Sequence, residues 1–138
     1  MRILAALDQS PFAAKVLDTA IALAKQQGAS LEIMTVAEDF LDMGDVMDTT
    51  MLTEKLFASA KTAAEKYAAT ASTQGIAASV IIEQGVSPAD LIISRATAQQ
   101  CDLVVMGHQG RSGLSRFLLG SVAARVVAHA PCSVLVVR

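Results

Sequence analysis

Residues 102–121 read DLVVMGHQGRSGLSRFLLGS and combine three kinds of segment. A short apolar run, typical of a buried strand, comes first. Gly107, Gly110 and Gly120 lie in the loop that follows, and Ser121 begins a run with helical character. Glycines let the backbone approach a ligand closely, and the free N–H groups at a helix start attract anions. The stretch therefore predicts a strand, a glycine-rich loop and a helix that together suit a phosphate group.

The rest of the chain repeats this alternation of strand and helix. Apolar runs predict strands at residues 3–7, 31–36, 78–83, 102–106 and 133–137. Helical patterns lie at residues 10–27, 53–74, 88–100 and 122–128. Ser10 and Ser87 are predicted N-caps, each followed by a proline that suits the first helical position. Parallel strands joined by crossover helices are covered on both faces. We therefore expect one α/β domain, residues 1–138, with a doubly wound five-stranded parallel sheet.

Composition argues against several classes of protein. Hydrophobic residues make up 53% of the chain, yet no uncharged run approaches the roughly 20 apolar residues that span a bilayer, so we expect no membrane insertion. The apolar run between Arg2 and Asp8 is too short for a secretory signal, and Cys101 and Cys132 form no Cys-x-x-Cys motif. We expect a cytoplasmic protein whose cysteines are small buried hydrophobes. The net charge of −2 argues against nucleic acid as a partner.

The positive charge is concentrated near the glycine-rich loop. Residues 103–138 contain no carboxylate side chain and four arginines, at positions 111, 116, 125 and 138. Such a distribution would attract an anion to this end of the chain. The alternative is that the arginines occupy an ordinary solvated face.

The glycine spacing matches neither of two common phosphate-binding loops. A Walker loop has Lys and then Ser or Thr after its last glycine, and a Rossmann loop has three glycines within six residues. Here the pattern is Gly107-x2-Gly110-x9-Gly120-Ser121, which resembles the nucleotide-binding signature of the universal stress protein family. The resemblance extends to residues 3–10, 85–92 and 130–137, and so covers nearly the whole chain.

This resemblance implies the strand order 3-2-1-4-5 of the adenine nucleotide alpha hydrolase-like fold. In that order the first and fourth strands are neighbours where the strand order reverses, and ligands of open α/β sheets bind there, outside the carboxyl ends of the strands. Asp8 and Gly107 follow these two strands, and Val36 ends the second strand. We therefore expect these three residues to border one crevice.

Each part of an adenine nucleotide, ATP or AMP, has a counterpart among these residues. The phosphates suit the amides of Gly110, Gly120 and Ser121, the Ser121 hydroxyl and the Arg111 guanidinium. Asp8 suits ribose hydroxyls or a Mg or Mn ion bound to the phosphates; alternatively, it caps the start of the first helix. The other candidates would form the slot for the base, or match nucleotide-contacting positions in ATP-binding members of the resembling family: Ala6, Leu7, Val36, Met106, Gly107, Val122 and Ala123.

Catalytic chemistry has little support in the sequence. His108 has no Ser-His-Asp, paired-carboxylate or metal-ligand spacing around it, and a lone loop histidine is expected at the surface or in binding. The resembling family more often has Ser at this position. His129, at the end of the last helix, is expected to interact with helix carbonyls. We predict no catalytic residue.

Three functions remain open from the sequence. The first is an adenine-nucleotide-binding stress-response module that changes its protein partner, which the sequence does not name, or its oligomeric state. The second is a regulatory interaction protein of the same fold that does not use nucleotide. The third, an adenylyl-transferring enzyme of a related superfamily, would need a substrate domain for which 138 residues leave no room.

Two further segments lead to predictions. Residues 37–52 contain five acids and no basic residue, and we expect a mobile connection that serves as a lid. Met43, Met47 and Met51 lie four apart there and are expected to pack against the body or a partner rather than bind a metal. The last strand, 133–137, would be an edge strand with unpaired backbone groups, which predicts a homodimer through this strand. The alternative is that the acidic segment covers that edge.

Overall fold

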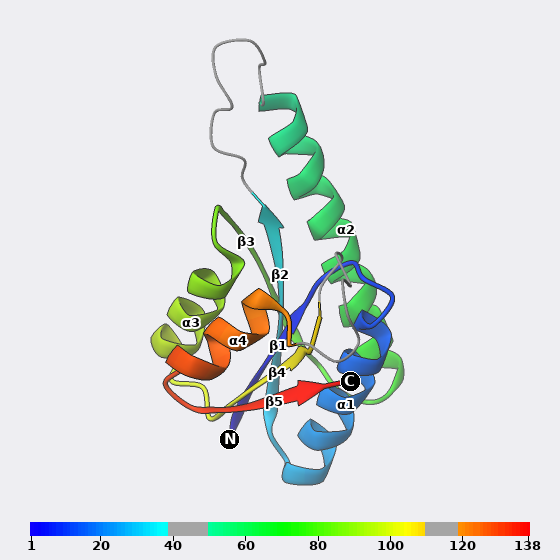
Figure 1. Ribbon diagram of the computed structural model, residues 1–138. Helices are drawn as coiled ribbons and strands as arrows, with labels where there is room; N and C mark the ends of the chain where they lie inside the picture. Colours follow the sequence, from blue (N-terminus) through cyan, green and yellow to red (C-terminus); the bar gives the residue numbers. More distant parts are fainter. Residues whose placement is uncertain (39–49, 110–118) are drawn as a thin grey trace.

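A computed structural model describes residues 1–38, 50–109 and 119–138. Five strands of the described residues form one sheet in the order β3-β2-β1-β4-β5, and every pair of neighbours is parallel (Figure 1). The strands are β1 (Arg2–Leu7), β2 (Ser30–Glu38), β3 (Ser79–Gly85), β4 (Leu103–Gly107) and β5 (Ser133–Val137). The predicted α/β class and strand order are confirmed.

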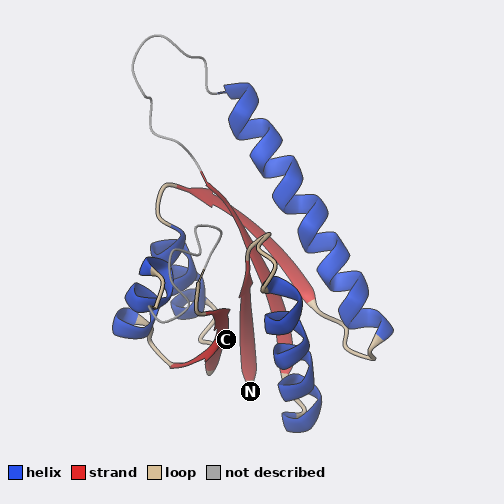
Figure 2. Ribbon diagram, turned by 45° about the vertical axis from the view of Figure 1, so that its right-hand side comes forward, coloured by secondary structure: helices blue, strands red, loops and turns tan. Residues whose placement is uncertain are grey.

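Helices cover both faces of the sheet (Figure 2). They are α1 (Ala13–Gln27), α2 (Thr50–Thr73), α3 (Pro88–Ala98) and α4 (Ser121–His129). The buried side chains of α1 and Ala71 of α2 share one hydrophobic cluster, and the buried side chains of α3 and α4 share a second. The first turns of α2 extend beyond the carboxyl ends of the strands (Figure 1).

The first apolar run, residues 3–7, has no alternating polar residues because it forms most of the central strand β1, which is covered on both faces. Ile3 and Ala5 belong to the cluster under α1, whereas Leu4 belongs to the cluster under α3 and α4. All three are at most 1% exposed. A strand covered on both faces buries successive side chains, because these point to opposite sides of the sheet.

Most predicted helix boundaries are reproduced. Ser87 caps α3, since its Oγ accepts from the N–H of Asp90 at 3.4 Å, and Pro88 is the first helical residue. Gly28 and Gly75 have positive φ angles of 61° and 89°, which glycine adopts at little cost after a helix.

The predicted N-cap role of Ser10 is wrong. Helix α1 begins at Ala13, with Phe12 in the N-cap position. The carboxylate of Asp8 accepts from the Ser10 N–H at 2.9 Å, and Ser10 Oγ accepts from the Phe12 N–H at 3.3 Å. Asp8 thus forms a turn with the backbone two residues on, and the Ser10 hydroxyl bonds an amide ahead of α1 instead of one in its first turn.

Cys101 is buried and Cys132 is partly buried, both as free thiols, and burial raises the pKa of each. Within the described ranges, no helix has the length and apolar character to cross a membrane. The predicted lid lies mostly in residues 39–49, outside the described residues, whereas residues 50–52 belong to α2.

Candidate functional site

A cavity of about 440 Å³ opens at the carboxyl ends of β1, β2 and β4, where the strand order reverses. The structure places around it every described residue that was predicted for the site: Ala6, Leu7, Asp8, Val36, Met106, Gly107, Gly120, Ser121, Val122 and Ala123. The other two predicted residues, Gly110 and Arg111, lie outside the described residues. The ends of β1 and β4, far apart in sequence, therefore border one cavity.

The start of α4 forms one wall of this cavity. Gly120 is the N-cap and, as a glycine, has no side chain that could accept from the first amides of the helix. Its φ of −62° and ψ of 157° lie in the extended region, which other residues also adopt, so conformation alone does not require glycine here. The Gly120 amide, predicted for the phosphates, is not free for them, because it donates to the His108 carbonyl at 2.7 Å. Ser121, Val122 and Ala123 form the first turn and line the cavity. A helix start of this kind favours a bound anion.

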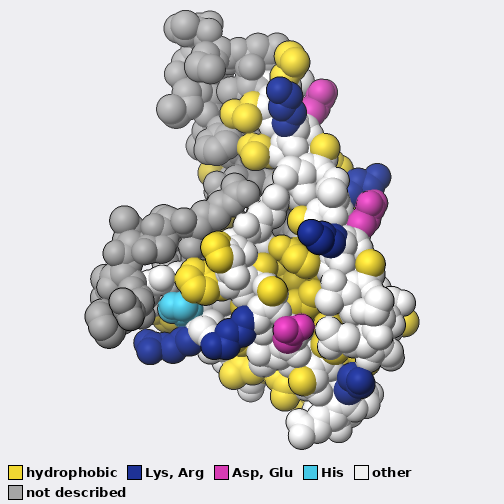
Figure 3. All heavy atoms as spheres, turned by 90° about the vertical axis from the view of Figure 1, so that its right-hand side faces the viewer, with side chains coloured by type: hydrophobic (Ala, Val, Ile, Leu, Met, Phe, Trp, Pro, Cys, Tyr) yellow, Lys and Arg dark blue, Asp and Glu magenta, His cyan; other side chains and the backbone are white. Residues whose placement is uncertain are grey.

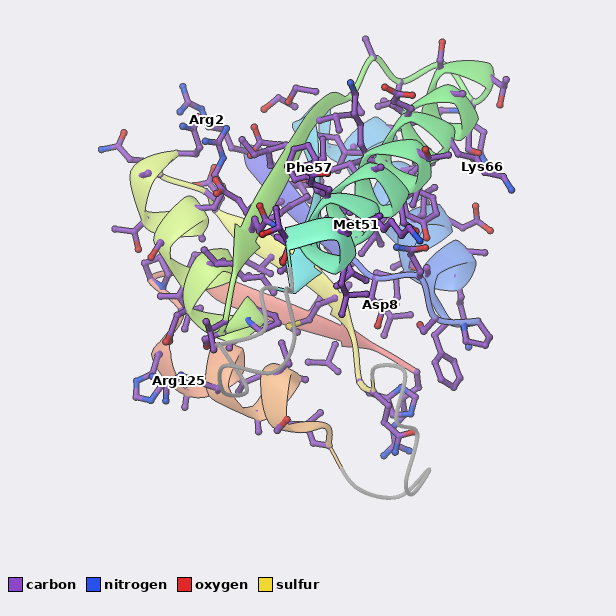
Figure 4. All side chains as sticks on the ribbon, turned by 90° about the horizontal axis from the view of Figure 1, so that it is seen from above. Arg2, Asp8, Met51, Phe57, Lys66 and Arg125 are labelled. Carbon is purple, nitrogen blue, oxygen red and sulfur yellow. The ribbon has the colours of Figure 1, made fainter. Side chains whose placement is uncertain are left out.

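Asp8 lies at the opposite wall, in the turn between β1 and α1. Its side chain is exposed, and Oδ1 accepts from the Ser10 N–H, so the second carboxylate oxygen is available to a ligand. Its backbone carbonyl accepts from the Tyr67 hydroxyl at 2.7 Å, and the neighbouring Gln9 Oε1 accepts from Ser59 at 2.9 Å. Two side chains of α2 thus hold this turn, and Figure 4 shows Asp8 near that helix.

Helices α2 and α3 contribute lining residues that the sequence analysis did not include. Leu56 and Ala60 of α2 and Ile92 of α3 border the cavity. The Thr35 hydroxyl, at the end of β2, donates to the Ala60 carbonyl at 3.1 Å and fixes this part of α2 against the sheet. The spacing of four between Leu56, Ala60 and the buried Ala64 is a helical signal that could have identified this inward face.

His108 is not a surface residue, contrary to one of the two expectations for it. It is 7% exposed, and its ring meets the ring of Phe12 edge-on, with centroids 5.4 Å apart and planes at 67°. Its Nδ1 lies 3.3 Å from the carbonyl oxygen of Val137. Sequence patterns cannot show such a contact, because Val137 lies at the far end of another strand. His108 also lines the cavity.

None of the described arginines lines the cavity. Arg125 forms an ion pair with Asp90 of α3 at 2.8 Å, and this hydrogen bond lowers the pKa of Asp90. Figure 4 shows Arg125 on the side of the molecule away from Asp8. Arg111 and Arg116 lie outside the described residues. In the parts of the chain that the structure describes, no three His, Cys, Asp or Glu side chains are grouped so as to hold a metal ion.

A doubly wound parallel sheet with a cavity at its topological switch point defines the structural class of this protein, and its relatives define the family. The family model described as the universal stress protein family matches residues 1–138. The chain belongs to this family. It is 35% identical to a universal stress protein of Thermus aquaticus, covering 99% of this chain and 97% of the relative. It is 32% identical to universal stress protein YxiE of Bacillus subtilis, covering 99% and 98%.

Solved structures show the same fold. The universal stress protein UspA from Lactobacillus plantarum superposes with a TM-score of 0.90 at 28% identity, over 100% of this chain and 97% of that one. Two structures at 23% identity share the fold alone. One is a universal stress protein in complex with cAMP, with a TM-score of 0.75, and the other is the protein from Archaeoglobus fulgidus in complex with dAMP, with a TM-score of 0.72.

Proposed function

We propose that this chain binds an adenine nucleotide, ATP or AMP, in the cavity at the carboxyl edge of the sheet and acts as a stress-response regulatory module. The observation that carries the proposal is the start of α4. It lacks a side-chain cap at Gly120 and meets the ends of β1, β2 and β4 around one cavity. A volume of about 440 Å³ lies within the range of roughly 300–1,000 Å³ that small-molecule sites occupy.

Each part of the nucleotide has a place in this proposal. The phosphates lie at the amides of Ser121, Val122 and Ala123 and near the Ser121 hydroxyl, where the helix dipole favours negative charge. The base lies among the apolar side chains at the ends of β1, β2 and β4: Ala6, Leu7, Val36 and Met106. Asp8 either accepts from ribose hydroxyls or binds a metal ion carried by the phosphates. The two solved structures of the same fold with adenine nucleotides support this choice of ligand.

A Mg or Mn ion would be bound mainly by phosphate oxygens. The described cavity lining offers one carboxylate, Asp8, with one oxygen already bonded to the Ser10 N–H. Both ions take oxygen ligands and tolerate several waters. Asp8 would therefore supply a single ligand to a metal that arrives with the nucleotide.

We propose a regulatory rather than an enzymatic role because the two titratable side chains that line the described cavity, Asp8 and His108, already make structural contacts. His108 packs against Phe12 and contacts the Val137 carbonyl, and Asp8 organises its own turn. General acid–base catalysis needs a group within hydrogen-bond reach of the reacting proton and free to exchange it. Neither side chain is therefore placed primarily as a general acid or base.

The second candidate, an interaction protein of the same fold that does not use nucleotide, is favoured by a different observation. Met51, Leu52 and Phe57 are 66%, 45% and 38% exposed on the first half of α2. Hydrophobic side chains lie between charged ones on the face shown in Figure 3. Exposed apolar groups of this kind suit a protein partner.

Mass spectrometry of the purified, denatured protein separates these two functions. Retained adenine nucleotide, or micromolar ATP or AMP binding in calorimetry, is expected from the first. Protein that releases no nucleotide and gives no binding heat with either compound would contradict it and leave the interaction protein.

We also propose that β5 forms a homodimer seam. β5 is an edge of the sheet, and its residues alternate between exposed and partly buried up to the buried Val137. Such an edge has backbone groups that a second copy can pair.

A further inference from the structure

His108 connects several elements although it belongs to none of them. It directly follows Gly107, the last residue of β4. Its backbone N–H donates to the carbonyl oxygen of Val137, the last residue of β5, at 3.0 Å. Its own carbonyl oxygen accepts from the N–H of Gly120, the N-cap of α4, at 2.7 Å. The main chain of this residue therefore joins the end of β5 to the start of α4.

The imidazole strengthens the same connection. Its Nδ1 lies 3.3 Å from the Val137 carbonyl oxygen, which already accepts the backbone N–H of His108. A carbonyl oxygen can only accept, so we assign the imidazole proton to Nδ1 in this contact. The ring also meets Phe12 edge-on, an arrangement that aromatic pairs prefer. Phe12 is the N-cap of α1, so the ring connects the end of β5 to the start of α1 as well.

Only some of the elements joined by His108 border the cavity. Gly107, Phe12, Gly120 and His108 line it, whereas the described lining includes no residue of β5. Strand β5 is instead an edge strand of the sheet. A ligand in the cavity would contact the start of α4 directly, and His108 hydrogen-bonds both to that helix start and to β5.

We propose that His108 is a positioning residue that couples ligand binding at the start of α4 to the order of β5. The proposal rests on the proposed function. Phosphate groups that order the first turn of α4 would fix the Gly120 N–H, and through it the His108 main chain and the Val137 carbonyl. The Nδ1 donor keeps this chain of hydrogen bonds together; the imidazole need not touch the phosphates.

Two variants of His108 distinguish the effect of the Nδ1 hydrogen-bond donor from the effect of the volume of the ring. His108→Asn keeps an N–H donor close to the position of Nδ1, and His108→Leu replaces the ring by an apolar side chain without a donor. His129→Leu makes the same substitution at an exposed residue, the last of α4, and serves as the matched control. Amide hydrogen exchange is measured on each protein with and without ATP, and the ATP affinity is measured by calorimetry.

In the wild type and in His129→Leu, ATP is expected to slow exchange at Gly120, at His108 and along β5. His108→Asn should keep this response. His108→Leu should lose the response along β5 and bind ATP about threefold to tenfold more weakly, the equivalent of one neutral hydrogen bond. Rescue by Asn distinguishes a donor that positions the main chain from a ring that only fills space.

The contrary results of these measurements contradict either the coupling or the proposed function. If the wild type binds ATP and both His108 variants respond like it, nucleotide binding stands and the coupling is overturned. If the wild type does not bind ATP, the proposed function is wrong. The role of His108 in joining β5 to α4 is then tested without nucleotide: amide exchange at Val137 and Gly120 should be faster in His108→Leu than in His108→Asn. Nitrogen-15 spectra of the wild-type imidazole need no variant, and a ring protonated at Nε2 alone would also overturn the proposal.

Discussion

Gly120 and Ser121 can be tested together because the backbone at the start of α4 tolerates other residues. Gly120 has φ and ψ of −62° and 157°, which valine adopts without strain. A branched side chain at Gly120 would obstruct the approach of a phosphate, and Ser121→Ala removes a hydroxyl whose hydrogen bond contributes about 0.5–3 kcal/mol, depending on charge. We expect Gly120→Val with Ser121→Ala to lose ATP binding in calorimetry while the circular dichroism spectrum is unchanged.

Ser94→Ala provides the control for this double variant, since Ser94 is exposed on α3 and remote from the described cavity lining. It should bind ATP like the wild type. Wild-type affinity in the double variant would remove the start of α4 from the site.

The charge of Asp8 can be removed without removing its turn. Asn at this position keeps the Oδ1 acceptor for the Ser10 N–H, so the turn before α1 should persist. A neutral amide is a weaker ligand for Mg²⁺ than a carboxylate. We expect Asp8→Asn to reduce the gain in ATP affinity that Mg²⁺ gives, and to change AMP binding in chelator much less. Equal losses with and without Mg²⁺ would assign Asp8 to the ribose instead.

At the scale of elements, α2 packs closely on the sheet through small residues. Ala60 and Ala64 are 1% and 0% exposed, and Thr35 of β2 hydrogen-bonds to the Ala60 carbonyl. Adding volume in a filled core commonly destabilises by about 1–3 kcal/mol. We expect Ala64→Leu to lower the free energy of unfolding by that amount in urea denaturation.

Ala69→Leu adds the same volume on the exposed face of α2. Because surface substitutions usually stay within about 0.5 kcal/mol of the wild type, it should unfold like the wild type. If Ala64→Leu were equally harmless, α2 would not be packed against β2 as closely as its buried alanines indicate.

The central strands were predictable from sequence because they are covered on both faces, and β5 because its side chains, although partly exposed, are apolar and mostly β-branched. Predicted limits of 3–7 and 133–137 agree with β1 and β5 within one residue. Apolar runs of this kind end where burial ends, so the pattern locates the strands directly. The order of the strands did not follow from periodicity, however. It came from the resemblance of the glycine spacing to a known family.

Tertiary contacts account for what the sequence did not predict. Ser10 has the residue type of an N-cap, but it lies in the turn that the Asp8 carboxylate forms, and α1 begins only at Ala13. His108 is buried by Phe12 and Val137, which approach it from other elements. Both outcomes depend on contacts with residues whose placement is set by the fold, and local propensity contains no information about them.

The arrangement of the whole sheet explains why the predicted site residues converge. In the order β3-β2-β1-β4-β5, β1 and β4 are neighbours, and their helices leave on opposite faces. The turns that follow them separate at the carboxyl edge and leave space between Asp8 and the start of α4. Any two segments placed after these strands would meet there, so the topology brings the site residues together and their chemistry decides what can bind.

The same order leaves β5 at an edge of the sheet. The Val137 carbonyl points toward β4, because it accepts from the His108 N–H that follows that strand. Backbone groups of successive residues in a strand alternate between its two sides, so the N–H and C=O of Val136 point outward. Leu135, between Val134 and Val136, is 36% exposed. Two copies that paired antiparallel along β5 would satisfy these outward groups and cover Leu135 with its symmetry mate.

Proline substitutions test this dimer at single N–H groups. Val136→Pro removes an outward N–H and should leave the pairing with β4 intact, since edge strands accept proline on their open side. Val136→Thr keeps the N–H and a β-branched side chain and should behave like the wild type. In light scattering at micromolar concentration, we expect a dimeric wild type, a dimeric Val136→Thr and a largely monomeric Val136→Pro with unchanged circular dichroism. A monomeric wild type would rule out the dimer, and a Val136→Pro protein that stays dimeric would place its seam elsewhere on the molecule.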